Sequence, residues 1–457
     1  MYKKNQTIHF VGIGGVGMSG IAQVLKNLGY NVQGSDISEN PNVKRLKSMG
    51  VKVFIGHSPE NINNADIIVK SSAIKDNNPE IIEAKNRGIP IIPRAEMLAE
   101  LMRMKYSIAV AGSHGKTTTT SMIGVILNKA NFDPTIVIGG KLDILGSNAK
   151  LGKGQFLVAE ADESDGSFLF LNPTIAVVTN IDEEHLDYYK RGIEEIKDTF
   201  INFINKVPFY GVAILCLEDA NIQDILPKIE KRTITYGFLK QADVRGENIF
   251  LNEFTSSFDV YIKNKYQGRI NIKMPGVHNV LNALGAISVA YELEISFEIV
   301  KEALNNFTGV NRRFYLKGFY KNAMVIDDYG HHPEEIKSTL TAIKQAFNRR
   351  VIAIFQPHRY TRVKALMDKF ATSFYNADKL IVTEIYPAGE DKINGISGEV
   401  LYEKIKEFGH KDVKFMKNFD EIVEYLTEVV EENDIVITFG AGDVWKIGEK
   451  LLKKIWI

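Results

Sequence analysis

A glycine-containing loop near residue 112 has the residue types of a phosphate-binding site. Residues 112–118 read Gly-Ser-His-Gly-Lys-Thr-Thr, between an apolar run at 107–110 that predicts a buried strand and a predicted helix over 119–129. The amides of such a loop and the N-terminus of the following helix face a bound anion. Lys116 can reach the outer phosphates of ATP, and a threonine hydroxyl can bind Mg²⁺. The first glycine stands at 112 and not at 110, where the usual P-loop has it. We therefore predict that ATP phosphates bind Gly112, Ser113, His114, Gly115, Lys116, Thr117 and Thr118.

A second glycine motif lies at the N-terminus and indicates another nucleotide site. Residues 7–11 predict a strand, 12–17 read Gly-Ile-Gly-Gly-Val-Gly, and a helical pattern continues to Leu28. This order is the dinucleotide fingerprint, and Asp36 stands after the next predicted strand, near where an acid that binds ribose belongs. The motif establishes only that a pyrophosphate can approach the backbone closely, so a nucleotide sugar satisfies it as well as NAD does.

Carboxylates and a histidine follow two further buried strands. The segment 160–165 holds four carboxylates in six residues: Glu160, Asp162, Glu163 and Asp165. Such a cluster suits Mg²⁺ near an ATP site, although a solvated acidic loop gives the same pattern. His185 follows the next strand among acidic neighbours, and it is either a metal ligand through a neutral imidazole or a surface or packing residue.

A predicted helix that begins near residue 277 carries three polar side chains, His278, Asn279 and Asn282. His278 and Asn282 are four residues apart and share one face of the helix. An imidazole can stack on a nucleotide base and an amide can read its edge, but capping of the helix explains these residues equally well.

Three segments in the last third of the chain are rich in groups that bind anions. They are an arginine pair at 312–313 and the stretches 327–333 and 356–362, and each of the two stretches follows a predicted strand. An arginine donates two parallel hydrogen bonds to a carboxylate, whereas arginines on a solvated surface are the alternative. The histidine pair at 331–332 has no further ligand at metal spacing nearby, so we do not expect a metal there.

Composition bounds the class of protein. The 457 residues correspond to about three domains, and a hydrophobic share of 45% with a charged share of 25% is ordinary for a globular protein. The formal net charge is zero, which removes a global attraction to nucleic acid or membrane. Cys216 is the single cysteine, and no apolar run is long enough to span a bilayer. Cleavage of a signal peptide would discard the first glycine motif, so we expect a cytoplasmic protein without disulfides.

The periodicity of the chain predicts three α/β units. In the first, strands alternate with helices, at 7–11, 31–34, 51–55, 66–70 and 89–92 for the strands and 18–28, 41–49, 79–87 and 94–104 for the helices. The second adds strands at 156–159, 174–179 and 211–216, antiparallel hairpins within 244–273, and helices at 277–291 and 296–305. The third has strands at 323–327, 350–355, 379–383 and 434–438, and helices at 333–346, 362–376, 397–407, 418–430 and 443–454. This alternation predicts parallel sheets with helices on both faces and ligands in the clefts between units.

Together the motifs resemble those of the Mur ligases of bacterial cell-wall synthesis. The resemblance covers essentially the whole chain and rests on eight ordered motifs, at 12–20, 71–74, 94–98, 112–118, 160–165, 278–282, 327–333 and 358–362. Two departures are visible, because Ser113 stands where the family usually has threonine and the segment 182–185 varies one that usually carries a proline. Neither departure alters a group that the chemistry needs.

The resemblance implies an architecture and a reaction. It implies a Rossmann-like domain at 1–104 for a UDP-sugar, a central P-loop ATPase-type domain at 105–311 with a mostly parallel sheet, and a Rossmann-like C-terminal domain at 312–457 that closes over an amino acid. The implied reaction joins L-alanine to the carboxylate of UDP-N-acetylmuramate through an acyl phosphate made from ATP. Mg²⁺, in two ions, is then the cofactor, and the protein is a monomer or homodimer that neither binds nucleic acid nor inserts into a membrane.

The resemblance also implies roles for single residues. Contacts to the UDP-sugar fall on Gly14, Gly15, Val16, Gly17, Asp36, His57 and Ser71. Contacts to ATP beyond the phosphate loop fall on His278, Asn279 and Asn282 for the adenine, and on Arg313 and Asp328 from the third domain. One Mg²⁺ lies near Thr117 and Glu160 and a second near Glu160 and His185, so that the catalytic residues are Lys116, Glu160 and His185. The amino-acid side of the site comprises Tyr329, His331, Arg359 and Arg362.

Three other functions remain open from the sequence. A ligase of the same superfamily that attaches a preformed tripeptide to the same UDP-sugar shares many motifs, although the residues at 162–165 favour the alanine reaction. A nicotinamide-dependent oxidoreductase explains the first glycine motif but not the ATP loop. A nucleotide-sensing protein without catalysis explains both loops but not the arginines of the third unit.

Overall fold

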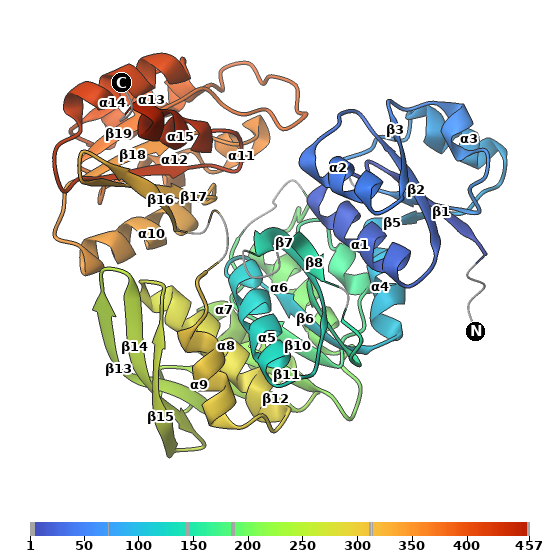
Figure 1. Ribbon diagram of the computed structural model, residues 1–457. Coiled ribbons are helices and arrows are strands. Elements are labelled where there is room, and N and C mark those ends of the chain that lie inside the picture. Colours follow the sequence, from blue (N-terminus) through green and yellow to red (C-terminus); the bar gives the residue numbers. More distant parts are fainter. Residues whose placement is uncertain are drawn as a thin grey trace.

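The computed structural model describes residues 5–71, 73–142, 147–150, 152–183, 188–309, 312 and 314–454. These residues form three α/β units, each built on its own sheet (Figure 1). The first and third units lie on opposite sides of the central unit, which carries the largest sheet. The predicted fold class, α/β with three domains and mostly parallel sheets, is confirmed.

In the first unit the described residues form a parallel five-stranded sheet in the order β3-β2-β1-β4-β5. The strands are β1 (Thr7–Val11), β2 (Asn31–Asp36), β3 (Lys52–Ile55), β4 (Ile67–Lys70) and β5 (Ile91–Pro93). The helices are α1 (Val16–Asn27), α2 (Pro41–Ser48), α3 (Pro79–Asn86) and α4 (Arg94–Arg103). The strand order changes direction at β1, and ligands of open parallel sheets bind at the carboxyl edge of such a switch point. The first glycine loop, directly after β1, therefore lies at a ligand-binding edge.

The central sheet has ten strands in the described part of the chain, in the order β15-β14-β13-β12-β11-β10-β6-β9-β7-β8. The strands are β6 (Tyr106–Ala111), β7 (Thr135–Leu142), β8 (Ser147–Lys150), β9 (Phe156–Glu160), β10 (Ile175–Val178), β11 (Val212–Cys216), β12 (Thr233–Gly237), β13 (Val244–Asn252), β14 (Thr255–Ile262) and β15 (Lys265–Ile272). The helices are α5 (Lys116–Lys129), α6 (Ile193–Ile204), α7 (Ala220–Ile225), α8 (Val277–Glu292) and α9 (Phe297–Asn305). The antiparallel hairpins predicted within 244–273 are confirmed as β13 to β15.

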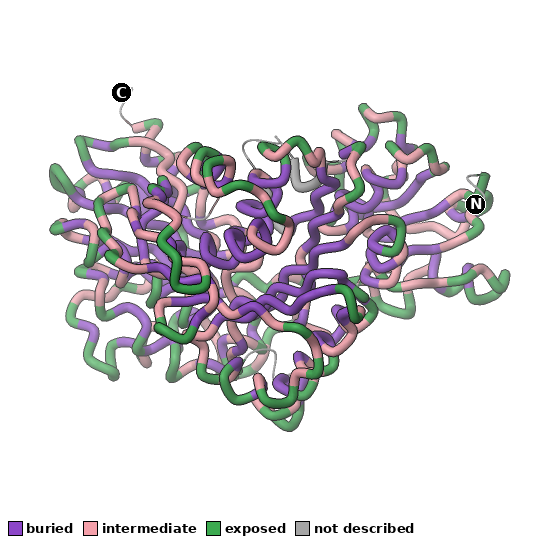
Figure 2. Tube along the Cα trace, turned by 90° about the horizontal axis from the view of Figure 1, so that it is seen from below, coloured by how far each residue is buried: buried purple, intermediate pink, exposed green. Residues whose placement is uncertain are grey.

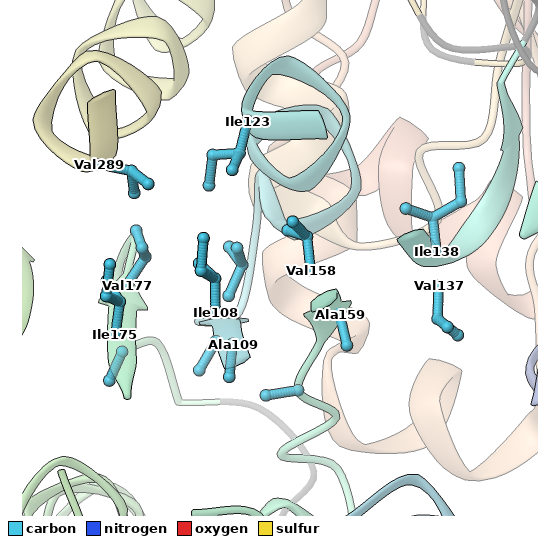
Figure 3. Close-up of a cluster of buried hydrophobic side chains, with 14 of the residues drawn as sticks. Ile108, Ala109, Ile123, Val137, Ile138, Val158, Ala159, Ile175, Val177 and Val289 are labelled. Atoms are coloured by element: carbon cyan, nitrogen blue, oxygen red, sulfur yellow. The ribbon is translucent and has the colours of Figure 1, made fainter. Parts of the chain in front are cut away.

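The middle of the central sheet is apolar on both faces because helices cover each side. Strands β6, β9 and β10 are nearly continuous apolar runs, which is typical of buried parallel strands. Figure 3 shows their side chains beneath Ile123 of α5 and Val289 of α8. This core holds the carboxyl ends of β6, β9 and β10 side by side, at one edge where polar loops follow.

The third unit carries a sheet in the order β16-β17-β21-β18-β19-β20, parallel except for β16, within the described range 314–454. The strands are β16 (Tyr315–Tyr320), β17 (Ala323–Asp328), β18 (Val351–Phe355), β19 (Lys379–Val382), β20 (Val413–Phe415) and β21 (Ile435–Phe439). The helices are α10 (Pro333–Ala346), α11 (Tyr360–Ala365), α12 (Met367–Ala371), α13 (Gly398–Glu407), α14 (Phe419–Val429) and α15 (Trp445–Lys453).

The single helix predicted over 362–376 is wrong. The chain forms two short helices there, α11 and α12, which meet at Leu366 with φ −117°. Leu366 is buried in the core of the unit, and the ring of Phe374 further along packs on Phe355. Tertiary packing thus overrides the helical period.

Contacts join the central unit to both neighbours. Arg94 at the start of α4 pairs with Asp162 after β9, with 3.1 Å between Nη2 and Oδ2. On the other side, the turn between β13 and β14 meets the segment between α10 and β18, where Arg349 pairs with Glu253 at 3.0 Å. Figure 2 shows buried segments running through all three units, with exposed segments at the periphery. In the described part of the chain, no helix has the length and apolarity needed to cross a membrane.

Candidate active site

The predicted phosphate loop connects β6 to α5, and the two residues that follow β10 fix its backbone by hydrogen bonds. The side chain of Asn180 accepts the amide of His114 at 2.7 Å and donates to its carbonyl at 3.1 Å. Thr179 donates its hydroxyl hydrogen to the same carbonyl at 2.5 Å. These bonds hold the loop backbone in one shape before any ligand arrives, which lowers the entropic cost of binding.

Lys116 lies folded against its own loop. Its ammonium donates to the carbonyls of Gly112 and Ser113 and to Glu163 Oε1, the last at 2.9 Å. The Glu163 side chain is only 4% exposed and that of Lys116 is 19% exposed, so solvent reaches this ion pair only from the lysine side. The cation is therefore stored beside the position that a phosphate would take.

Helix α8 approaches the phosphate loop at Gly115, which has a left-handed φ of 80°. A Cβ atom at this position would lie 2.3 Å from Asn282 Oδ1, so only glycine fits. Asn282 also accepts the hydroxyl of Thr119 at 3.2 Å and donates to Asn279 at 3.3 Å. The structure thus places Asn282, one of the three predicted adenine-contact residues, against the loop predicted to bind the phosphates, with Asn279 hydrogen-bonded behind it.

A cavity of about 190 Å³ lies between the central and third units. Its walls include the predicted ATP-binding residues His114, Gly115, Thr117, Thr118, His278, Asn279, Asn282 and Asp328. Residues Glu334 to Ala342 of α10 close its other side, and His114 Nδ1 is 3.9 Å from Glu335 Oε1. The cavity therefore depends on the third unit packing over the phosphate loop.

Two residues with oxygen donors, Glu160 and Thr117, lie at this edge of the central sheet. Glu160 ends β9, in register with Val110 just before the loop, and Thr117 stands in the first turn of α5. Hydroxyl and carboxylate oxygens are the ligands that Mg²⁺ prefers, and it commonly takes one or two carboxylates together with substrate phosphates. The donor set fits that ion, and among the described residues no cluster of three or more His, Cys, Asp or Glu side chains would hold a metal alone.

The carboxylate of Asp36 holds the first glycine loop by hydrogen bonds to backbone amides. Asp36 Oδ2 accepts the Gly14 amide at 2.8 Å, and its Oδ1 accepts the amide of Ser38 at 3.2 Å. A Cβ at Gly14 would lie 2.4 Å from the Asn40 side chain, which donates to the Gly14 carbonyl. Asp36, predicted to bind the UDP-sugar, thus also shapes the loop, and Ser71 lies against the loop at Gly12.

Arg94 lies at the first glycine loop, and the sequence analysis gave it no role. Its guanidinium lies against the first glycine loop, since a Cβ at Gly17 would be 2.9 Å from Nη1. The same side chain pairs with Asp162 of the central unit. A basic side chain at the start of a helix has no motif of its own, and only the fold shows that it faces the loop.

His57, also predicted on the UDP side, joins a buried polar cluster. Its Nδ1 is 3.0 Å from Ser35 Oγ and 3.2 Å from Glu80 Oε2. Its side chain is 13% exposed, so one edge of the ring reaches solvent at the carboxyl edge of the first sheet.

The predicted amino-acid residues gather at one end of the third sheet. His331 Nδ1 is 3.0 Å from the carbonyl of Tyr329 and therefore donates to it. Burial, together with the Arg362 guanidinium, lowers the pKa of His331 to about 3. Burial and the cations of Arg362 and Arg359 lower the pKa of His358 to about 4. Both imidazoles are therefore neutral near pH 7, beside two arginines.

Two predicted residues lie outside the described residues, namely Arg313 and His185. The neighbouring Arg312 pairs with Asp327 at 3.0 Å and lies over the ring of Tyr329. Arg312 therefore braces the predicted amino-acid side.

Family models match three successive parts of the chain. The one described as Mur ligase family, catalytic domain, matches residues 7–106. The Mur ligase middle domain matches residues 110–290, and the one described as Mur ligase, glutamate ligase domain, matches residues 312–442.

Curated relatives match the chain from end to end. A UDP-N-acetylmuramate–L-alanine ligase of Trichlorobacter lovleyi is 56% identical over 456 residues, which covers 100% of both chains. A protein of the same name from Geobacter sp. strain M21 is 57% identical, with 100% of this chain and 99% of the relative covered.

Solved structures agree with these relatives. The UDP-N-acetylmuramate–alanine ligase of Thermotoga maritima is 30% identical and superposes with a TM-score of 0.84, covering 99% of each chain. A murein peptide ligase from Psychrobacter arcticus is 26% identical with a TM-score of 0.73, covering 98% of each chain.

Proposed function

The chain belongs to the Mur ligase family, and from this premise we propose that it joins L-alanine to the carboxylate of UDP-N-acetylmuramate with cleavage of ATP to ADP and phosphate. The observation that carries the choice of substrates is the match over the full length to relatives named for this reaction. The product of the proposed reaction is a bacterial peptidoglycan precursor. Membership of a ligase family displaces the nicotinamide oxidoreductase and the nucleotide sensor, since neither joins two substrates.

We assign one substrate to each unit. Residues 1–104 take the UDP-sugar at the first glycine loop, and residues 105–311 take ATP at the second. Residues 312–457 take the amino acid and close the ATP cavity through α10. These substrates are metabolites of the cytoplasm, which is where we place the reaction.

In the first step of this reaction the γ-phosphoryl group of ATP moves to a carboxylate oxygen of the muramoyl group. Lys116, released from Glu163, stabilises the charge on the phosphoryl oxygens as the bond to ADP breaks. Thr117 and Glu160 would hold one Mg²⁺, and Glu160 and His185 a second, and these ions would neutralise phosphate charge. Most of the rate comes from holding the two substrates in line.

In the second step the amine of alanine attacks the acyl carbon and phosphate leaves. Arg359 and Arg362 bind the alanine carboxylate as planar hydrogen-bond donors. His331 donates through Nδ1 to the Tyr329 carbonyl, so its Nε2 lone pair is left to accept a hydrogen bond from the amine and orient it. The proton that the amine loses leaves with the phosphate. Neither step needs a covalent bond to the protein.

Phosphate release with ATP and UDP-N-acetylmuramate tests this function directly. Each amino acid and the tripeptide are offered in turn. We expect rapid release with L-alanine, and much slower release with the tripeptide and with larger amino acids. Rapid release with the tripeptide alone would assign the chain to the peptide ligases instead, and release with neither would refute the proposed reaction.

A further inference from the structure

A fully buried carboxylate, Glu80, lies at the centre of a polar cluster in the first unit. Glu80 stands in the first turn of α3 and is 0% exposed. The side chains around it come from β1, β2 and the segment after β3, and they are His9, Gln33, Ser35, His57 and Asn61. The reaction uses none of them directly except His57.

Hydrogen-bond donors surround both oxygens of this carboxylate. Ser35 donates to Oε2 and Asn61 donates to Oε1, each at 2.6 Å. His57 Nδ1 is 3.2 Å from Oε2, and His9 Nε2 is 3.6 Å from it. Burial by itself raises the pKa of Glu80, but the nearby His9 ring and the hydrogen bonds from Ser35 and Asn61 outweigh it and lower the pKa to about 2. The group is therefore an anion at neutral pH.

This arrangement determines which nitrogen of His57 carries the proton. Ser35 has one hydroxyl hydrogen, and the short bond to an anion takes it. Ser35 Oγ, 3.0 Å from His57 Nδ1, can then only accept, as can the Glu80 oxygen beside it. Two acceptors face one ring nitrogen, so Nδ1 must be protonated.

His9 shows the opposite state in the same cluster. The amide nitrogen of Gln33 donates both to the Asn61 carbonyl at 3.0 Å and to His9 Nδ1 at 3.2 Å. His9 Nδ1 is therefore an acceptor, and its Nε2 hydrogen points toward Glu80. One carboxylate thus orders two histidines in two different tautomers.

The cluster is continuous with the first glycine loop. The Ser35 carbonyl accepts the amides of Gly12 and Ile13 at 2.9 and 3.0 Å. The residue before His57, Gly56, donates its amide to the Asp36 carbonyl at 2.8 Å. His57 is thus anchored to the strand ends that shape the loop, and among the described residues nothing hydrogen-bonds its Nε2.

We propose that Glu80 is a positioning residue that locks His57 in the Nδ1-protonated tautomer and so presents the Nε2 lone pair to a hydrogen-bond donor of the bound nucleoside. This inference rests on the proposed binding of the UDP-sugar at this edge. A lone pair cannot bond to a phosphate oxygen, so the partner is an imide N–H of the base or a hydroxyl of the ribose.

The tautomer is measured without any substrate. Nitrogen-15 NMR of the histidine-labelled protein resolves the ring nitrogens of nine histidines, and the His57→Ala variant identifies its signals. We expect a protonated Nδ1 and a bare Nε2 for His57 at pH 8, and a shift toward the other tautomer in Glu80→Gln. A bare Nδ1 in the wild-type protein would overturn the proposal, whatever the enzyme activity.

Steady-state kinetics then test whether Glu80 positions His57 or only supports the fold. Because one hydrogen bond to the ligand is at stake, His57→Ala and Glu80→Gln should each raise the KM for UDP-N-acetylmuramate by about three- to tenfold. The kcat and the KM for ATP should stay near the wild-type values. In the double variant the two effects should not add, since Glu80 acts through His57. Additive effects, or a loss of kcat in Glu80→Gln alone, would overturn the positioning role.

The matched control is Glu83→Gln, in the same helix. Glu83 pairs with Arg87 on the surface at 2.6 Å and touches no member of the cluster. Its KM values and its His57 spectrum should equal those of the wild-type protein.

Competition with modified nucleotides identifies the donor. UDP, its N3-methyl form, and its 2′-deoxy and 3′-deoxy forms are compared on wild-type protein and on His57→Ala. We expect one modified form to bind the wild type more weakly than UDP does, and to lose that difference in His57→Ala. If all four bind equally in both proteins, His57 meets no nucleoside donor and the inference fails. Absence of phosphate release with every acceptor would refute the proposed reaction but leave the tautomer result unaffected.

Discussion

Two glycine loops of this molecule follow a buried parallel strand and precede a helix, yet they receive their positive charge from different places. The second loop carries its cation within the motif, as Lys116 at the start of α5. The first loop has no charged residue of its own, and its nearby cation, Arg94, comes from α4. The acidic segment after β9 holds both, because Asp162 pairs with Arg94 and the adjacent Glu163 pairs with Lys116.

This difference in the origin of the cation agrees with the function proposed for each loop. A phosphoryl group that is transferred needs a charge placed on the reacting oxygens, and a lysine inside the loop supplies it. A pyrophosphate that is only bound needs backbone amides and a charge nearby. The same strand, loop and helix can therefore bind a nucleotide that reacts or a nucleotide that is only held in place. The position of the cation decides between the two.

Removal of the cation from the second loop should have the largest effect. In Lys116→Ala, kcat should fall by about 10²–10³ or more, because the lost charge acts on the transition state. Binding of UDP-N-acetylmuramate, measured by calorimetry, should not change. A folded Lys116→Ala protein with near-normal turnover would show that the cation of the second loop does not act on a transferred phosphoryl group, and would contradict the proposed difference between the loops.

Lowering the pH should remove the stabilisation that the Glu80 carboxylate gives to the first unit. The pKa of Glu80 is lowered to about 2 in the folded protein, so its stabilising contribution is complete above the ordinary value of about 4.5 and is lost as the pH falls toward 2. That shift corresponds to about 3 kcal/mol. The difference in unfolding free energy between wild type and Glu80→Gln should thus be largest at pH 7 and shrink below pH 4.5. A difference that does not change with pH would show that Glu80 stabilises the unit without its charge.

Removal of the cation at the first loop should affect one substrate only. Arg94→Ala should raise the KM for UDP-N-acetylmuramate by about 10- to 100-fold, the effect of one charged hydrogen bond. The KM for ATP should stay constant, and Arg94→Lys should restore only part of the loss. If the UDP-sugar KM is unaffected, Arg94 serves only to join the first two units.

The acids that hold the two cations should matter least. Asp162 and Arg94 are both partly exposed, at 44% and 24% of their side chains, so Asp162→Asn should change the UDP-sugar KM by less than about fivefold. The pair of Glu163 and Lys116 is drier, so Glu163→Gln should change the KM for ATP more than Asp162→Asn changes that for the UDP-sugar. Steady-state kinetics with each substrate varied in turn measures both KM changes. A larger change in Asp162→Asn than in Glu163→Gln would contradict the proposal that these two acids hold the cations beside the loops.

The sequence predicted both loops because glycines and a lysine at fixed spacing after an apolar strand are local signals. The shared face of His278 and Asn282 left capping and nucleotide binding equally open, and only the family resemblance implied an adenine contact there; in the structure, α8 places Asn282 against the second loop. The sequence did not predict the positions of Arg94 and Glu80, because Arg94 contacts a loop and Glu80 contacts side chains that are distant along the chain, and neither residue has a motif of its own. The break at Leu366 was missed for a related reason, because burial of that side chain and not its helix propensity decides the backbone there.

The division of nucleotides between the two loops is tested most directly by calorimetric binding to two glycine variants. A methyl group at Gly115 would meet Asn282 at 2.3 Å in the second loop, and one at Gly14 would meet Asn40 at 2.4 Å in the first. We predict that Gly115→Ala loses a non-hydrolysable ATP analogue and keeps UDP-N-acetylmuramate, whereas Gly14→Ala does the reverse, with both proteins folded by circular dichroism. If either variant loses the ligand assigned to the other loop, or both variants lose both ligands while folded, the assignment of one nucleotide to each loop is wrong.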